Sequence, residues 1–430
     1  MTQRVSYLVA PRLHKLGANV RPPKTRIQRS RTRHNACICS GSPHVRAQWN
    51  ASAGGLADVG VSDPLRRRQP RQRRISNGAD RPRGERMGDG RRCSDHNGEK
   101  AGKDGQNSIT FIDGLFKDQN FLAVTTNWYD DSGHMAEADI QIDPSVVPGG
   151  YNLQLLVEHE VGHLLGLDHS GVLSSVMYPF VGRGGIAALD SDEKLAIAEL
   201  YPAVDPMNAG GILTGRVNGD GGGIFAAQVV ALNDKGQPVA IALTNQQGEF
   251  ELDGVPPGTY QLYAEPLDGP VFLQNLSGIW QTAKNESFPT EFADGGPLHV
   301  EAGRIYGNLV VNSSGTTTLN PKWIGVSAAA GSDMSLGAMP IVVSPGQTVN
   351  IAVGGDGFVS GMTTLEIPNR SFRRTSNFSY AGNYVSATFN VASDAPSGSL
   401  TVLVKSGNQS AALTGGIRVA GSARARVVRR

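Results

Sequence analysis

Three histidines and one glutamate lie close together in the segment 159–169. His159 and His163 stand four positions apart, so a helix would place both imidazoles on one face, about one turn from each other. Glu160 follows the first histidine. Two imidazoles at this spacing can bind one zinc ion. A carboxylate beside them can accept a proton from a zinc-bound water and pass it to a leaving amine. The pattern predicts zinc-dependent hydrolysis with Glu160 as the general base.

A third candidate ligand, His169, follows after a glycine at position 166. The chain must leave the helix sharply for His169 to return to the metal, and Gly166 tolerates the backbone angles that this requires. Three neutral nitrogen ligands leave the fourth zinc position open for chemistry. The alternative is a buried amphipathic helix with incidental histidines. Burying three imidazoles and a carboxylate without a partner would be costly, which favours the metal site.

Two helices and three strands are expected around these residues. The run YNLQLLVEHEVGHLLG at 151–166 predicts a helix with Asn152 as its N-cap. A second helix is expected at about 191–200, since Asp190 and Glu193 form a capping-box pattern. Upstream, the runs SITFIDGLF, FLAVTTNWYD and AEADIQID carry the β-branched residues and partial alternation typical of strands. The segment should therefore be an α+β unit.

The residues around the histidines resemble a known protease family. HEVGHLLGLDH resembles the extended zinc motif of the metzincins, and HSGVLSSVMYP at 169–179 is similar to the matrixin branch. The resemblance implies a zinc metallopeptidase in which Met177 is the Met-turn methionine, packed beneath the zinc ligands. Astacin-like and serralysin-like members place a metal-binding tyrosine two residues after that methionine. Here that position is Pro179, so Tyr178 is not expected to be a ligand.

The same resemblance suggests where substrate would bind. In matrixins the last strand before the active-site helix is an edge that pairs with extended peptide, which implies that residues 136–142, with Ala138 and Ile140, bind substrate. The segment from Pro179 to Arg183 would line the S1′ pocket. Phe180 is a candidate wall of that pocket or a plain core residue.

Further metals are suggested only by the family. Matrixins often hold a structural zinc and calcium through His and Asp residues upstream of the active-site helix. His134 is therefore a candidate ligand of Ca²⁺ or of a structural Zn²⁺, and otherwise an exposed loop residue.

The resemblance covers residues 107–205, whereas matrixin catalytic domains carry further strands and a helix upstream. Residues 1–106 are basic, of low complexity and without a sustained hydrophobic period. We expect them to be disordered, because they cannot bury enough apolar surface to offset chain entropy. Either the domain is minimal, or its true upstream half is missing or replaced. A nucleic-acid-binding arm is the less favoured interpretation, because the segment has no aromatic interleaving and no binding motif.

Two all-β modules are expected downstream. Residues 210–315 resemble the carboxypeptidase regulatory-like sandwich, through GILTGRV, the NQQGEF turn and VPPGTY. Residues 318–420 resemble an immunoglobulin-like sandwich of the IPT kind, through DAPSGSLTVLVKSGNQSAAL. Neither module shows a catalytic constellation. We expect spacers or adhesive modules that bind matrix, glycan or cell-surface ligands.

The predicted protein is thus multidomain, with a disordered N-terminal region, an α+β metzincin-type zinc protease domain and two β-sandwiches. Its predicted function is zinc-dependent endopeptidase activity on protein or peptide substrates. The alternative is an adhesion protein with a vestigial protease domain. No apolar run approaches the length of a membrane span, and no signal-peptide pattern is visible. The expectation of a secreted, extracellular protein rests on the resemblance.

Overall fold

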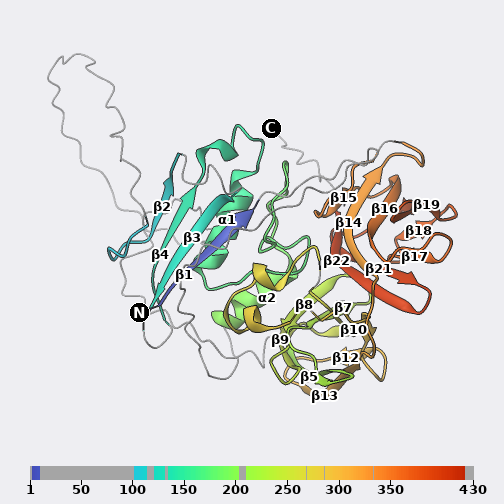
Figure 1. Ribbon diagram of the computed structural model, residues 1–430, viewed down its shortest axis with the longest axis horizontal. Helices are drawn as coiled ribbons and strands as arrows, with labels where there is room; N and C mark the ends of the chain where they lie inside the picture. Colours follow the sequence, from blue (N-terminus) through green and yellow to red (C-terminus); the bar gives the residue numbers. More distant parts are fainter. Residues whose placement is uncertain are drawn as a thin grey trace, which may run out of the picture.

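Five β-sheets and two α-helices form most of the regular structure in the described part of the chain (Figure 1). The computed structural model describes residues 2–9 (backbone only), 101–113, 121–130, 134–202, 210–267, 269–284, 286–332 and 334–421. The described chain is mostly β-sheet with few helices, as the sequence predicts for the region after residue 210.

The first sheet has the strand order β1-β3-β4-β2. Strand β3 (Phe121–Tyr129) pairs antiparallel with β1 (Thr2–Val9) on one side and with β4 (Met135–Ile142) on the other. Strand β2 (Ser108–Phe111) pairs parallel with β4. Helix α1 (Leu153–Leu164) packs on this sheet through a core that includes Ala123, Ile140, Leu155 and Leu156.

The prediction that residues 136–142 form an edge strand is wrong. Strand β4 is hydrogen-bonded to β3 on one side and to β2 on the other, so it has no open edge for a peptide. Ala138 and Ile140 are both completely buried, and Ile140 belongs to the core beneath α1. The physical reason is the upstream strand β2, which covers the edge that the resemblance left open.

The structure also differs from the expected disorder of residues 1–106 at two places. Residues 2–9 form strand β1. Around residues 101–106, the backbone amides of Asp104 and Gly105 donate to the buried carboxylate of Glu137, at 2.9 and 2.7 Å. The remaining basic segment, 10–100, lies outside the described residues together with Cys37, Cys39 and Cys93.

Local capping interactions explain where the helices begin. The side chain of Asn152 accepts hydrogen bonds from the amides of Gln154 and Leu155, as expected for the N-cap of α1. Helix α2 (Ser191–Leu200) begins with the predicted capping box, in which the amide of Asp190 donates to Glu193 at 2.7 Å. A 3₁₀ helix, η1 (Pro144–Val146), precedes α1. Both predicted helices are confirmed.

Residues 211–312 form two sheets that pack face to face, here called the first sandwich. One sheet contains β13, β5, β6 and β9, the other β11, β10, β7, β8 and β12. They share one apolar core, with Leu213 and Val311 from the first sheet and Val229 and Leu262 from the second. The strands are β5 (Gly211–Gly219), β6 (Gly222–Gly223), β7 (Gln228–Asn233), β8 (Pro238–Leu243), β9 (Glu249–Val255), β10 (Gly258–Glu265), β11 (Glu291–Phe292), β12 (Leu298–Val300) and β13 (Ile305–Asn312).

Between β10 and β11 the chain forms two short 3₁₀ helices that the sequence did not predict. They are η2 (Leu273–Asn275) and η3 (Gly278–Thr282). Leu273 and Leu276 are buried in a small apolar cluster with Ala226 and Leu267, which fastens this segment to the first sandwich.

Residues 320–419 form the second sandwich, again from two sheets with one shared core. One sheet contains β14, β16, β20, β18 and β19, the other β15, β22, β21 and β17. The strands are β14 (Asn320–Ser327), β15 (Ile341–Val343), β16 (Thr348–Asp356), β17 (Thr363–Glu366), β18 (Phe372–Arg374), β19 (Ser379–Ala381), β20 (Tyr384–Val391), β21 (Gly398–Ser406) and β22 (Gln409–Val419). Among the described residues, no helix is long and apolar enough to cross a membrane.

Candidate metal centre

The three histidines of the predicted zinc site lie together at the end of helix α1. His159 and His163 project from consecutive turns of the helix and are almost completely buried. Gly166 follows the helix with a φ of +99°, a value that favours glycine, and this turn brings His169 back to the helix. One ligand atom from each histidine lies within 4.8 Å of the other two. The structure therefore brings together the three residues that the sequence pattern singled out.

Each histidine directs its Nδ1 atom at a backbone carbonyl. The Nδ1 of His159 faces the oxygen of Val176 at 2.7 Å, and that of His163 faces the oxygen of Leu167 at 2.9 Å. The Nδ1 of His169 faces the oxygen of Asn275. A carbonyl can only accept, so each Nδ1 carries the proton and each Nε2 keeps its lone pair. This is the tautomer that binds metal through Nε2.

Burial favours the neutral form of His159. It lowers the pKa of His159 well below its usual value, and the neighbouring His163 and His169 lower it further. Neutral imidazole is the form that coordinates zinc. The Nε2 of His159 and the Oε1 of Glu160 are buried and have no hydrogen-bond partner among the described residues. Two such orphaned polar atoms beside one another are costly unless a ligand satisfies them, and a Zn²⁺ with its open position fits this need.

Glu160 is fully buried and is oriented by strand β3. The hydroxyl of Thr125 donates to its Oε2 at 2.5 Å, which leaves Oε1 directed elsewhere. Burial raises the pKa of Glu160 to about 8, and the Thr125 hydrogen bond works against that rise. A divalent cation held by the histidines would lower this pKa again, since it favours the ionised carboxylate.

Met177 lies under the helix at the position of Gly162. A Cβ atom built on Gly162 would lie 2.2 Å from the Met177 sulfur, so only glycine lets the methionine approach this closely. The turn that carries Met177 is held by Glu193 of α2, whose Oε1 accepts from the Met177 amide at 3.2 Å and from the Ser175 hydroxyl. Met177 thus packs against helix α1 at Gly162, which stands between His159 and His163 in the sequence.

The residues predicted to bind substrate lie in β4 and in the segment after Met177. Phe180 lines a cavity of about 200 Å³ whose walls also include Leu155 and Val176, whereas Pro179 is buried and does not line it. The Tyr178 hydroxyl donates to the oxygen of Ala338 in the second sandwich, which agrees with its exclusion as a ligand. Ala138 and Ile140 are buried in β4.

His134 contacts Asp130, with 3.2 Å between its Nδ1 and the Asp130 Oδ2. Among the described residues, the three histidines are the one group of three or more potential ligands that could hold a metal ion. The calcium and structural zinc suggested for His134 therefore stay predictions.

Sequence reasoning missed the residues that support the ligands. Thr125 lies in a predicted strand, and alternation along that strand would have placed it on the face that meets the helix. Glu193 was noted only as a helix cap. Asn275 gave no signal, because its contact with His169 depends on how two distant segments pack.

Comparison with known proteins places the zinc motif in a family. Residues 98–202 match the family model of the matrixins (Peptidase M10). Karilysin of Tannerella forsythia is 44% identical over 57 residues, which is 13% of this chain and 12% of karilysin. Human matrix metalloproteinase-26 is 67% identical over 30 residues, 7% of this chain and 12% of the relative. Dog matrix metalloproteinase-9 is 43% identical over 58 residues, 13% of this chain and 8% of the relative.

These matches are short. The chain spans only about a tenth of the length of the curated relatives that it matches. Among solved structures, the major pilin subunit BcpA of Bacillus cereus aligns over 49% of this chain and 69% of its own at 10% identity. Its TM-score of 0.17 is too low to bear on the fold. The family model matches residues 98–202, and the curated relatives include karilysin and two matrix metalloproteinases, so this chain carries a matrixin-like metzincin segment.

Proposed function

We propose that this protein is a zinc-dependent endopeptidase whose metal ligands are His159, His163 and His169 and whose general base is Glu160. The observation that carries the proposal is the convergence of three imidazoles beside a buried carboxylate on one helix and its following turn. Strands β2, β3 and β4 with α1 and α2 would be the α+β metzincin unit, within the proposed limits 107–205, followed by sandwiches at 210–315 and 318–420. Met177 and Gly166 would support the site.

When bound, zinc would act as a Lewis acid that polarises a scissile carbonyl and makes a water easier to deprotonate. The protein's part is to hold and move the proton. Oε1 of Glu160 is the oxygen that can take it, since Oε2 is occupied by the Thr125 hydroxyl. The same carboxyl group can then deliver the proton to the leaving amine. The Thr125 hydroxyl also lies 3.2 Å from the backbone oxygen of Glu160, so its single proton can be shared between this oxygen and Oε2.

Peptide substrates would bind along strand β3 rather than β4. Thr125 contacts Glu160, and the side-chain amide of Asn127 donates to the backbone oxygen of His163 at 3.0 Å, so β3 crosses directly over the catalytic helix. The edge of β3 that faces away from β4 pairs with β1, with Ser6 opposite Thr125. An extended peptide could add to this edge in the same antiparallel sense. A peptide bound there would have to displace β1, which occupies the same edge of β3.

Action outside the cytoplasm is proposed on the matrixin resemblance. We also propose, from the family resemblance of the two sandwiches, that they bind matrix, glycan or cell-surface ligands. A DNA-binding role for the basic head is not proposed.

The test is hydrolysis of casein by the purified full chain, beside Glu160→Gln, with and without a chelator. We expect the wild type to cleave, the chelator to abolish cleavage and added Zn²⁺ to restore it. Glu160→Gln keeps the shape of the side chain but cannot take up the proton, so activity should fall by at least about a hundredfold. Equal zinc content in both proteins separates loss of the base from loss of the metal. A wild type that binds zinc but cleaves nothing would favour the alternative, an adhesion protein with a vestigial protease segment.

A further inference from the structure

The third histidine is held differently from the other two. The carbonyls that face His159 and His163 belong to Val176 and Leu167, inside the matrixin-like segment. The carbonyl that faces His169 belongs to Asn275, in the first sandwich and more than a hundred residues further along the chain. The orientation of one proposed zinc ligand therefore depends on a different module.

The residue before His169 is fastened to the same place. Asp168 accepts two hydrogen bonds from Ser277 at its Oδ2, from the amide at 2.9 Å and from the hydroxyl at 2.5 Å. Its other oxygen, Oδ1, accepts from the amide of His169 at 2.8 Å. One carboxylate thus links Ser277 to the backbone of the ligand. Together with the Asn275 carbonyl, it fixes both the backbone and the ring of His169.

The segment that makes these contacts is held in place by local hydrogen bonds and by apolar burial. The side-chain oxygen of Asn275 accepts from the backbone amide of Phe272 at 3.0 Å. The backbone amide of Asn275 donates to the backbone oxygen of Phe272 at 2.8 Å. Leu273 and Leu276, on either side of Asn275, are buried in the first sandwich. The carbonyl that meets His169 is therefore placed by the core of that sandwich rather than by a mobile loop.

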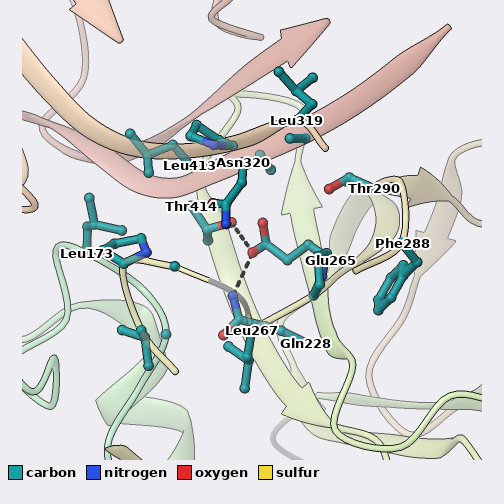
Figure 2. A pocket seen from close by; sticks show the side chains of 18 residues that line it. Leu173, Gln228, Glu265, Leu267, Phe288, Thr290, Leu319, Asn320, Leu413 and Thr414 are labelled. Carbon is teal, nitrogen blue, oxygen red and sulfur yellow. Dashed lines mark hydrogen bonds between the residues drawn. The ribbon is translucent and has the colours of Figure 1, made fainter. Parts of the chain in front are cut away.

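The chain after His169 continues into a junction of all three parts of the molecule (Figure 2). A Cβ on Gly171 would lie 2.2 Å from Oε1 of Gln228, so this loop lies against strand β7. Gln228 donates to Oε1 of Glu265 at 2.6 Å, and the Thr414 hydroxyl of the second sandwich donates to the same oxygen at 2.5 Å. The amide of Leu173 donates to the oxygen of Thr414 at 3.0 Å. Both sandwiches thus contact the segment between His169 and Met177.

We propose that the first sandwich is a working part of the metal centre, in which Asn275 and Ser277 position His169 for zinc. The inference rests on the proposed zinc site and goes beyond it. The sandwich is then more than a spacer or adhesive module, because without it the third ligand loses its orienting carbonyl and the anchor of the preceding residue. Partners that orient metal ligands in this way typically contribute ten- to a hundredfold to metal affinity.

Zinc affinity of the full chain tests the proposal without reference to proteolysis. The metal-free protein is titrated with Zn²⁺ against a chromophoric chelator, for the wild type, Ser277→Ala and Ser277→Thr. We expect Ser277→Ala to weaken zinc binding about tenfold, since the amide of residue 277 still donates, and Ser277→Thr to keep most of the affinity. Thr282→Ala is the matched control. It removes a hydroxyl from the neighbouring η3, where Thr282 donates only to Ile279, and should change nothing.

A double-mutant cycle locates the effect. Asp168→Ala removes the acceptor, so adding Ser277→Ala to it should cause no further loss if the two act through each other. Equal zinc affinity for wild type and Ser277→Ala would overturn the inference while leaving the proposed protease intact. A wild type that binds no zinc would overturn both.

Should Ser277→Ala unfold the protein, ¹⁵N spectra of the wild-type histidines give the answer. We expect His169 to be a single tautomer protonated at Nδ1, assigned by comparison with His169→Gln. A mixture of the two tautomers in the metal-free chain would contradict the proposal.

Discussion

The sulfur of Met177 lies where the side chain of residue 162 would be if that residue were not glycine. Gly162 stands between the two helical histidines. Because the Met177 sulfur occupies the space of a Cβ atom there, residue 162 must be glycine for the two to pack in this way. Gly162→Ala would force the Met177 side chain or the helix to move. Overpacking of this kind costs about 1–3 kcal/mol of unfolding free energy. We expect a lower melting temperature and weaker zinc binding, measured by calorimetry and chelator competition.

The reciprocal variant changes Met177 instead of Gly162. Met177→Ala alone should leave a cavity, whereas Gly162→Ala combined with Met177→Ala should be more stable than the sum of the two losses predicts, because each relieves the other. Simple additivity would show that the two side chains do not meet.

Thr125 should set the pH range of catalysis. Its hydrogen bond to Oε2 of Glu160 favours the ionised carboxylate and so opposes the rise that burial causes in the Glu160 pKa. Thr125→Val removes the hydroxyl and keeps the shape. The pKa of Glu160 should then rise further, and the base would remain protonated up to a higher pH. The acid limb of the profile of kcat/KM against pH should therefore move to higher pH, with activity at neutral pH falling about tenfold.

Thr126→Val is the control for this change. Thr126 is equally buried, but its side chain points to the opposite face of β3, so the same substitution should leave the acid limb where it is. An identical shift in both variants would mean that the effect comes from the strand rather than from the hydrogen bond to Glu160.

Asp192 should make stability depend on pH. Burial, together with the charge of neighbouring Glu193, raises the pKa of Asp192 from 3.8 to about 7, while the Ser170 hydroxyl bonded to it at 2.6 Å works the other way. The folded protein thus keeps a proton that the unfolded chain releases near pH 4. The stabilisation is complete below pH 4 and is lost as pH rises from about 4 to about 7. Asp192→Asn should flatten this part of the profile of melting temperature against pH.

Asp294→Asn is the control, because it removes the same charge from an exposed position in the first sandwich. This variant should keep the wild-type slope of melting temperature against pH. A slope that survives in Asp192→Asn would show that another group is responsible.

Most of the secondary structure and the identity of the metal cluster could be predicted from local sequence. The zinc motif is local, with two histidines one helical turn apart and a glycine that reverses the chain, so neighbouring residues suffice to bring the three histidines together, although the contact that orients His169 comes from the first sandwich. The caps at Asn152 and Asp190 and the alternating strands after residue 210 are equally local. The meeting of the three histidines, the helix caps and the strands are confirmed, because the cause of each lies within a few neighbouring residues.

The errors and omissions concern contacts between distant segments. The edge position predicted for β4 is wrong, because nothing in the sequence of this strand reveals that β2 pairs with it. The support of His169 by Asn275 was missed for the same reason. The sandwiches were predicted as separate modules, since a run of strands shows its own core but not the surface that it presents to a neighbour.

The pairing of β1 with β3 leads to a last prediction. Residues 2–9 run antiparallel along the outer edge of β3, with Val5 opposite Thr126 and Ser6 opposite Thr125. If extended substrates use this edge, β1 must leave before they can bind, and its departure should limit cleavage. Deletion of residues 2–9 should then lower KM for a peptide substrate several-fold, with kcat little changed, because the catalytic residues are untouched. The measurement is steady-state cleavage of a fluorogenic peptide by the two proteins.

Two double variants show whether the effect of the deletion comes from losing the hydrogen bonds between β1 and β3 or from shortening the chain. Val5→Pro combined with Ser6→Pro removes two amides from the centre of β1 and should reproduce the deletion, since proline cannot donate to a sheet. Val5→Ala combined with Ser6→Ala keeps both amides and should behave like the wild type. A deletion that raises KM or unfolds the first sheet would show instead that β1 is a structural strand of the sheet, and substrate would then have to bind at another edge.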